Sequence, residues 1–336
     1  MQVMPLAEAL LDVAPGATRA LVLEGDQVLE AHLERDDAGP LPGARHVARL
    51  VQVLVPGVRA VARLACGTEV LLQPVPAVPE GGLLGLEITR MALPEAGRPR
   101  LARARPADGP LGTCAEVAAG PSLAARLKAA GHKVRLLRSG AEDTLEEAGW
   151  GEVMAEAETG HVRFEDGLLT ISLTPAMTVI DIDGALPPAA LAQAACVPLA
   201  CAIRRLGLGG SIAVDFPTLK GGARKALDRM LAAALAAHLP RPFEVTGING
   251  FGLVQIVRPH AYIGVMKAVR VPGHAALELL RRAARGLGPA TLTGPPGMID
   301  WLVARPELLA AVERARGGTL RLQAEPGLAT SAAHVG

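Results

Sequence analysis

The sequence predicts an α/β protein with several domains, and three observations support this prediction. The chain has 336 residues, which is enough for about two or three hydrophobic cores. Strand-like and helix-like segments alternate over residues 177–239, a pattern typical of parallel strands joined by crossover helices. Short strand-like segments, broken by glycine and proline, fill residues 46–76 and indicate a small barrel or meander.

The composition narrows the classes of function. The formal net charge is +1, so the chain as a whole does not attract nucleic acid, and a polyanion site would have to be a local patch. The four cysteines are Cys66, Cys114, Cys196 and Cys201. They form no C-x-x-C pair, which favours reduced thiols in a cytoplasmic protein over a zinc site. The N-terminus lacks the pattern of a signal peptide.

One uncharged stretch, residues 184–203, is long enough to suggest a membrane span. It contains Pro187, Pro188, Gln193 and Pro198, however, and half of its other residues are alanine, which gains little free energy in lipid. We therefore expect a buried crossover helix with a kink at Pro198, and no membrane partner.

In the N-terminal half, residues 1–45 are expected to combine a short helical stretch with two strands, TRALVLEG and QVLEAHLE. The strands of the following region are HVARLVQVL, VRAVARLA, TEVLLQPV and LLGLEITRMAL. The segment GRPRLARARPADG then places four arginines among proline and glycine: Arg98, Arg100, Arg103 and Arg105. This composition indicates a basic linker or arm and a domain boundary. Residues 121–148 are expected to be helical.

In the C-terminal half, HVRFEDGLLTISL predicts a hairpin that turns at Asp166-Gly167. MTVIDID and GGSIAVDF are the strands, and PPAALAQAACVPLACAIRRLG and GGARKALDRMLAAALAAHL the helices, of a unit with parallel strands. FEVTGINGFGLVQIVRPH predicts two strands around an Asn249-Gly250 turn. The tail from about Gly273 predicts a small α/β unit with the order helix, strand, helix, strand.

Acidic side chains follow the two parallel strands. Asp181 and Asp183 share one face of a strand, because residues i and i+2 point the same way. At about 5 Å and an effective dielectric near 20, their repulsion is roughly 3 kcal/mol and requires compensation. Asp215 ends the next strand, and functional groups collect where parallel strands end.

Three carboxylates at strand ends suit Mg²⁺ or Mn²⁺, and zinc is not expected because no histidine lies beside them. Such a site can orient a phosphodiester and generate a metal-bound hydroxide. Helix capping, binding of sugar hydroxyls and pairing with arginines remain alternative roles for these acids.

The motifs VRFEDGLLTISLTPAMTVIDID, GGSIAVDF and INGFGLVQIVR, in this order, resemble the catalytic core of the ribonuclease E/G family. The resemblance continues in order through most of the chain. It implies an N-terminal segment of an RNase H-like region (1–45), a degenerate OB-fold-like RNA-binding domain (46–105), an RNase H-like/DNase I-like catalytic region (106–262) and a small α/β domain (263–336).

The resemblance implies a magnesium-dependent endoribonuclease that cuts single-stranded RNA and leaves 5′-phosphate and 3′-hydroxyl ends. Asp181 and Asp215 match the family's metal-binding aspartates, whereas Asp183 stands where the family has asparagine. Contacts with RNA phosphates are expected from Lys220, Arg224, Lys225, Arg258 and the arginines of the basic arm, Arg98, Arg100, Arg103 and Arg105. His260 is expected to be a surface residue.

The chain departs from the family in ways that indicate a reduced member. The stretch RPHAYIGVMKAVRVPGHAAL lacks the family's C-P-x-C-x-G motif, so a zinc-linked dimer is not expected. The V-R-T motif of the 5′ sensor and the base-stacking aromatics of the barrel region are also missing. Two other functions therefore remain open: a catalytically weak or inactive RNA-binding protein, and an unrelated magnesium enzyme that acts on a phosphorylated small molecule.

Overall fold

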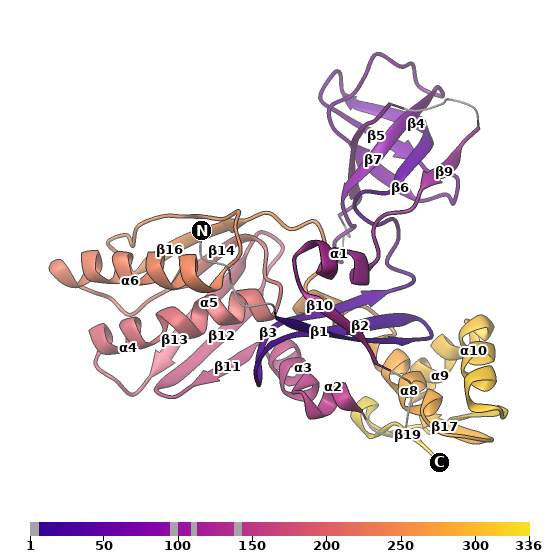
Figure 1. Ribbon diagram of the computed structural model, residues 1–336. Helices are drawn as coiled ribbons and strands as arrows, with labels where there is room; N and C mark the ends of the chain where they lie inside the picture. The colour runs from indigo at the N-terminus through magenta and orange to yellow at the C-terminus, as the bar shows by residue number, and fades with distance from the viewer. Residues whose placement is uncertain (1–6, 95–99, 109–112, 138–142) are drawn as a thin grey trace.

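The computed structural model describes residues 7–94, 100–108, 113–137 and 143–336. The protein has α/β architecture with several mixed sheets, as the sequence predicts. Figure 1 shows a central four-stranded sheet from which a small barrel projects. A six-stranded sheet covered by helices lies on one side of this centre, and the C-terminal unit lies on the other.

The central sheet has the strand order β10-β1-β2-β3. Its strands are β1 (Glu8–Ala14), β2 (Ala17–Glu24), β3 (Gln27–Arg35) and β10 (Lys133–Leu136). The short helix expected near the N-terminus is wrong for residues 8–14, because this segment pairs with β2 on one side and β10 on the other. Pairing on both sides outweighs the helical preference of a segment such as EALLDVA.

The barrel is inserted between β3 and β10. Its strands are β4 (Arg45–Val55), β5 (Arg59–Arg63), β6 (Glu69–Leu72), β7 (Leu83–Arg90) and β8 (Ala102–Pro106). The barrel closes because β4 pairs with both β5 and β7, and β9 (Ala115–Ala118) extends the sheet beyond β4. Its small core consists mainly of alanine, leucine and valine side chains from these strands.

The basic linker predicted around residues 97–109 is wrong for residues 102–106, which form strand β8. Ala102 and Ala104 face the barrel core, while Arg103 and Arg105 alternate with them on the outside. Alanine is only weakly hydrophobic, so the alternation of buried and exposed residues in this strand is difficult to detect in the sequence. Arg98 lies outside the described residues.

The region after the barrel is only partly helical. Helix α1 (Leu123–Ala129) agrees with the sequence, but β10 interrupts the helical stretch expected over residues 121–148. Helices α2 (Thr144–Glu147) and α3 (Trp150–Thr159) follow. Trp150 is buried in the main hydrophobic core, which joins the central sheet to the six-stranded sheet and the C-terminal unit.

The six-stranded sheet, called here the carboxylate sheet, has the order β11-β12-β13-β14-β16-β15. Its strands are β11 (His161–Phe164), β12 (Gly167–Leu173), β13 (Thr178–Gly184), β14 (Gly210–Asp215), β15 (Glu244–Val245) and β16 (Leu253–Arg258). The predicted hairpin β11–β12 and the parallel pairing of β13 with β14 are both confirmed. The strands on either side of Asn249-Gly250 also pair, although β15 is short.

Three helices accompany this sheet: α4 (Pro188–Ala194), α5 (Cys196–Arg205) and α6 (Gly222–His238). The crossover helix breaks between α4 and α5, close to the predicted kink. Pro198 has no N–H to donate to Ala194, and its ring crowds that carbonyl, so the break falls within this turn. No helix in the described part of the chain is both long and apolar enough to cross a membrane.

The helices cover one face of the carboxylate sheet and leave the other open. Ile180, Ile212, Val214 and Val254 point to the covered face and are fully buried or nearly so. The alternate residues of the same strands, including Asp181 and Asp215, are exposed or half-buried. The carboxylates therefore lie on the face that solvent can reach.

The C-terminal unit contains elements that the sequence did not indicate: α7, α9, a 3₁₀ turn and β19. Its elements are α7 (Val265–Ala268), α8 (His274–Ala284), β17 (Ala290–Gly294), α9 (Pro296–Val303), α10 (Pro306–Arg316), β18 (Leu320–Ala324), a 3₁₀ turn (Thr330–Ala332) and β19 (His334–Val335). The sheet order is β18-β17-β19, with parallel pairing of β17 and β18.

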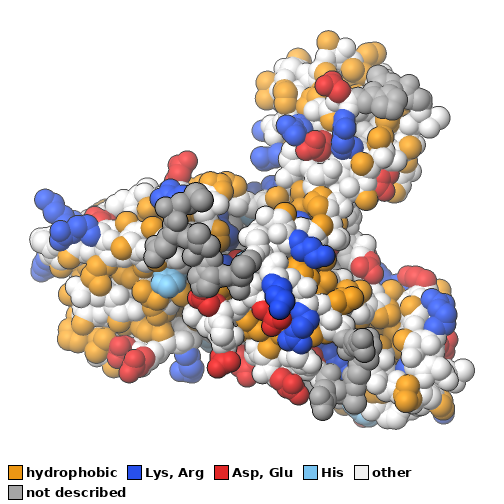
Figure 2. Space-filling view, in the orientation of Figure 1, with side chains coloured by type: hydrophobic (Ala, Val, Ile, Leu, Met, Phe, Trp, Pro, Cys, Tyr) orange, Lys and Arg blue, Asp and Glu red, His pale blue; other side chains and the backbone are white. Residues whose placement is uncertain are grey.

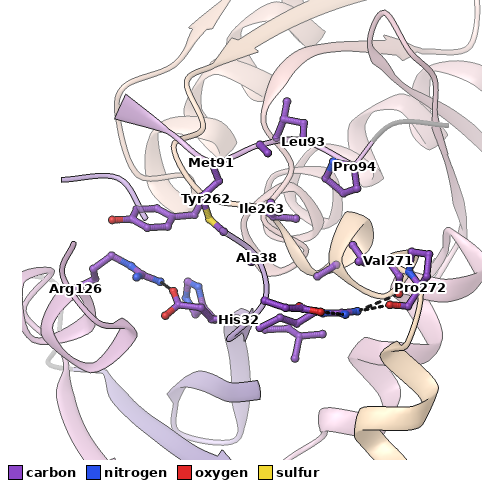
Figure 3. Close-up of a pocket in the computed structure, with 16 residues that line it drawn as sticks. His32, Ala38, Met91, Leu93, Pro94, Arg126, Tyr262, Ile263, Val271 and Pro272 are labelled. Atoms are coloured by element: carbon purple, nitrogen blue, oxygen red, sulfur yellow. Dashed lines mark hydrogen bonds and ion pairs between the residues drawn. The ribbon is translucent and has the colours of Figure 1, made fainter. Parts of the chain in front are cut away.

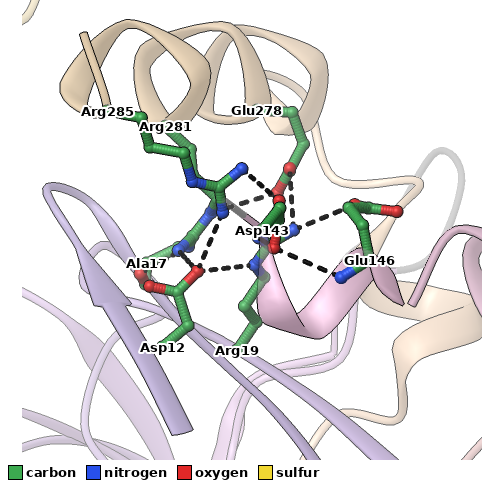
Figure 4. Close-up of polar contacts among 8 residues, drawn as sticks. All are labelled: Asp12, Ala17, Arg19, Asp143, Glu146, Glu278, Arg281 and Arg285. Carbon is green, nitrogen blue, oxygen red and sulfur yellow. Dashed lines mark hydrogen bonds and ion pairs between the residues drawn. The ribbon is translucent and has the colours of Figure 1, made fainter. Parts of the chain in front are cut away.

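Charged side chains around the buried Arg19 and Arg281 join this unit to the central sheet (Figure 4). The group, called here the arginine cluster, consists of Asp12, Arg19, Asp143, Glu146, Glu278, Arg281 and Arg285. Asp12 accepts from Arg19 at 2.9 Å and from Arg281 of α8 at 2.8 Å. Arg19 is completely buried, and the carboxylates of Glu278 and Asp143 outweigh its burial and raise the pKa of its guanidinium.

Candidate functional site

Two aspartates from neighbouring strands lie side by side on the open face of the carboxylate sheet. Asp181 of β13 and Asp215 of β14 are register partners in the parallel pair. Adjacent strands are about 4.8 Å apart, so the two side chains leave the sheet close together. The same register row continues to Thr170 of β12 and Leu253 of β16.

The third predicted carboxylate, Asp183, lies beyond the paired part of the two strands. Asp183 lies two residues beyond Asp181, where β13 no longer pairs with β14, and its register partner is Leu168 of β12. Within the described ranges, no group of three or more His, Cys, Asp or Glu side chains is arranged to hold a metal ion. The expected cluster of three acids is therefore present as an aspartate pair with a third carboxylate nearby.

The pair has few protein partners. Oδ1 of Asp181 accepts a hydrogen bond from the backbone N–H of Ile182 at 3.0 Å. Neither Asp181 nor Asp215 forms an ion pair with any residue that the structure describes. Two exposed, uncompensated carboxylates fit a hard divalent cation, which prefers oxygen ligands and keeps several waters.

A loop from β15 to β16 borders Asp215. Gly252 has φ +97° and adjoins this aspartate so closely that an added Cβ would lie 3.6 Å from Oδ1 of Asp215 and 2.4 Å from the Phe216 carbonyl oxygen. The Asn249 side chain accepts hydrogen bonds from Phe251 N and Leu253 N at 2.8 and 3.1 Å. The Asn-Gly signal in the sequence predicted a turn here but did not show that the turn touches the site.

Basic side chains lie at the start of α6, next along the chain from Asp215. Lys220 and Lys225 are exposed, and Arg224 is half-buried with its Nε donating to the Leu219 carbonyl at 2.9 Å. No side chain caps the N-terminus of α6, and no acidic residue lies in its first turn. These features favour an anion, because uncapped N–H groups and the helix dipole are both positive there. Figure 2 shows a group of Lys and Arg side chains at the outer end of the lobe that contains α6.

Other residues predicted to bind phosphate lie elsewhere. Arg258 pairs in register with Gly210, at the end of β14 opposite to Asp215, and donates to the Leu208 carbonyl at 3.1 Å. Five strand residues separate these ends, a distance of about 16 Å. Arg258 is therefore remote from the aspartate pair, and burial lowers its pKa.

The arginines of the barrel side are also dispersed. Arg100 donates to the Pro175 carbonyl at 2.6 Å, and Arg105 forms an ion pair with Glu87 at 2.9 Å. Arg103 is exposed on the outer face of β8. These arginines lie in separate environments and do not form the single basic arm that the sequence predicted.

His260 is not the surface residue expected from the sequence. Its ring packs against Gly209 and Gly210, and its Nε2 is buried without a hydrogen-bond partner among the described residues. Burial and the neighbouring positive charges, led by Lys267, lower its pKa to about 4. It lies at the end of β14 remote from Asp215 and takes no part in the candidate site.

A separate cavity of about 350 Å³ lies where the barrel meets the rest of the protein (Figure 3). Its charged walls are already paired. Arg126 binds Glu34 at 2.6 Å and covers the ring of Tyr262 at 3.8 Å, and Arg35 binds Asp37 at 2.7 Å. These contacts explain how the joint is held together, and none of the predicted site residues lines the cavity.

No protein-family model matches the chain, and no curated protein matches it. The resemblance to the ribonuclease E/G family therefore stays a prediction that depends on the motifs of the sequence.

Proposed function

We propose that the protein is a metal-dependent endoribonuclease that hydrolyses phosphodiester bonds of single-stranded RNA at Asp181 and Asp215. The observation that supports this most is the in-register pair of exposed aspartates on an otherwise open sheet face, without ion-pair partners in the described ranges. The order of the motifs that resemble the ribonuclease E/G family supports the choice of RNA as substrate.

In this proposal Asp181 and Asp215 hold Mg²⁺ or Mn²⁺, which supplies charge stabilisation and an activated water when bound. Lys220, Lys225 and the N-terminus of α6 bind neighbouring phosphates and fix the strand relative to the aspartates. Asp183 adds negative charge beside the pair where the family has asparagine. The barrel offers exposed Arg103 as a further backbone contact.

The second function, RNA binding without turnover, is favoured by one observation. The described residues contain the aspartate pair and no group of three or more His, Cys, Asp or Glu that could hold a metal ion, so cation binding would depend on few protein ligands. Both functions predict binding of single-stranded RNA, and they differ in the cation requirement and in the chemical step.

The deciding experiment is cleavage of a 5′-labelled, unstructured RNA by the full chain, with Mg²⁺, with Mn²⁺ and with a chelator. We expect cation-dependent products that end in 3′-hydroxyl groups, and loss of these products with Asp181→Asn. RNA that is bound but stays intact with either cation would overturn the nuclease proposal in favour of RNA binding alone. RNA that is neither bound nor cut would overturn both.

A further inference from the structure

Phe251 is the one aromatic side chain that the fold does not use. The chain contains four Phe, two Trp and one Tyr, and Phe251 is 84% exposed. The other six pack into the main core or beneath arginine side chains: Trp150, Phe164, Phe216, Phe243, Tyr262 and Trp301. Because most of this ring stays in solvent, it contributes little hydrophobic free energy to folding.

The loop that carries Phe251 is held in place by backbone hydrogen bonds of the residues before and after it. Asn249 binds the backbone N–H groups of Phe251 and Leu253 through one side-chain oxygen. Asp228 of α6 accepts from the N–H of Ile248 at 2.7 Å, and the N–H of Phe216 donates to the Gly252 carbonyl at 3.1 Å. The ring is therefore displayed on a fixed backbone.

Phe251 is also next to the groups assigned to the phosphodiester. It directly precedes Gly252, whose Cβ position lies 3.6 Å from Oδ1 of Asp215. On its other side is Gly250, whose Cβ position lies 3.9 Å from Nη1 of Arg224. Consecutive Cα atoms are about 3.8 Å apart, so the ring starts one residue away from both a carboxylate and a guanidinium.

We propose that Phe251 forms a nucleobase-stacking subsite beside the aspartate pair, so that one base of a single strand lies on the ring while its phosphate lies near Asp215. This inference rests on the proposed function, because it names how that site holds its substrate. Every base presents a π-face, so stacking accepts any sequence and suits unpaired strands. Leu253, two residues after Phe251, is also an exposed apolar residue.

The subsite gives a physical reason why the barrel can lack stacking aromatics. A single strand needs both backbone contacts and base contacts to bind tightly. Here the base contact lies on the carboxylate sheet, directly at the reacting phosphate, and the barrel contributes charge alone.

The first test compares binding of a single-stranded RNA with binding of an oligonucleotide of the same length that lacks bases, both in a chelator. We expect the wild-type chain to prefer the RNA, and Phe251→Ala to weaken RNA binding by about 5-fold to 100-fold without changing the binding of the abasic strand. Leu287→Ala is the matched control, because Leu287 is 86% exposed and lies in the C-terminal unit. Equal loss for both strands, or no loss, would overturn the subsite.

The second test places a fluorescent ring at the same position with Phe251→Trp. We expect this variant to retain RNA binding and its added fluorescence to be quenched by RNA and not by the abasic strand. Leu287→Trp serves as the control and should not be quenched. Quenching that is equal in the two variants would contradict stacking at residue 251.

Failure of the subsite and failure of the proposed function give different results. If the Phe251→Ala variant cleaves and binds RNA as the wild type does, the subsite is refuted and the nuclease proposal stands. Base-dependent quenching in a chain that never cuts RNA refutes the nuclease and supports the subsite in an RNA-binding protein.

Discussion

The protein contains two groups of carboxylates that differ in how their charge is compensated. In the arginine cluster, Asp12 receives hydrogen bonds from the buried Arg19 and Arg281. Hydrogen bonds from Arg19 and Arg285 overcome the effect of burial and lower the pKa of Asp143. On the carboxylate sheet, Asp181 and Asp215 are exposed register partners without an ion pair in the described ranges.

The difference separates carboxylates that stabilise the fold from the carboxylates that we propose to bind a cation. A buried carboxylate has to be paired, because removing a partner leaves an uncompensated charge in a region of low dielectric. Two adjacent carboxylates in solvent repel each other, and protein cations do not remove that repulsion here. The same substitution, Asp to Asn, should therefore have opposite consequences in the two groups.

The largest effect is expected for Asp215→Asn, which should lower RNA cleavage by at least about 100-fold. Loss of residues that only support metal ligands already costs about 10-fold to 100-fold, so loss of a proposed ligand should cost as much or more. Stability should change by no more than about 0.5 kcal/mol, since Asp215 is exposed. Cleavage rates at saturating Mg²⁺ and denaturant unfolding measure the two quantities, and a large loss of stability would place Asp215 with the structural carboxylates.

The matched substitution in the other group, Asp12→Asn, should lower the free energy of unfolding by about 2 kcal/mol. It removes the charge that compensates Arg19 and Arg281 while keeping the shape of the side chain. Guanidinium unfolding of both Asn variants measures the effect. The folded Asp12→Asn protein should cleave RNA as the wild type does, and reduced cleavage with unchanged stability would break the comparison.

A smaller effect, with a defined pH range, is expected at His260. Its pKa is lowered from 6.5 to about 4, so the unfolded chain binds a proton that the folded protein does not. Above about pH 6.5 this difference has no effect on the free energy of unfolding. As the pH falls from about 6.5 towards about 4, the protein loses roughly 1–2 kcal/mol of stability through this partly exposed group.

The variant His260→Phe keeps a planar ring and removes the titration. We expect it to lose less stability than the wild type between pH 6.5 and pH 4. Its RNA cleavage at neutral pH should be unchanged, because His260 lies at the end of β14 away from Asp215. Parallel stability profiles for the two proteins would contradict this assignment.

The smallest effect on RNA binding is expected in the barrel, where an arginine with an ion-pair partner can be compared with one without. Arg105 pairs with Glu87, whereas Arg103 has no ion pair in the described ranges. We expect Arg103→Gln to weaken RNA binding a few-fold and to reduce the slope of log affinity against log salt by about 1. Arg105→Gln should change the slope less. Titrations at several salt concentrations measure both, and equal slopes would show that the barrel surface does not contact RNA.

The local patterns of the sequence were sufficient for the carboxylate sheet and much of the C-terminal unit. β-branched strands, alanine-rich helices and the Asp166-Gly167 and Asn249-Gly250 turns are strong signals over short distances, and the parallel pairing of β13 and β14 followed from chain order. Because each strand carries an aspartate near its carboxyl end, the pairing also predicted the neighbouring carboxylates. The place of Asp183 came from the register, which shows that β13 continues beyond its pairing with β14.

Where the sequence failed, the structure depends on contacts between distant segments. The helical preference of residues 8–14 loses to pairing with β2 and with β10, which lies more than a hundred residues further along the chain. Strand β8 forms because the barrel must close, although its own alternation consists only of alanine and arginine. The positions of Arg258 and His260 follow from the antiparallel register of β16 and from packing against β14.

By itself, the sequence determined most of the strands, helices and turns of the carboxylate sheet, and that two acidic strand ends meet. Those features depend on local preference and on the handedness of the chain. Only the tertiary structure decided which acids are neutralised, which arginines reach them, and that Phe251 stays in solvent next in the chain to the glycine that adjoins Asp215. Compensation of charge and burial of a ring depend on neighbours brought together from remote parts of the chain, which no local pattern encodes.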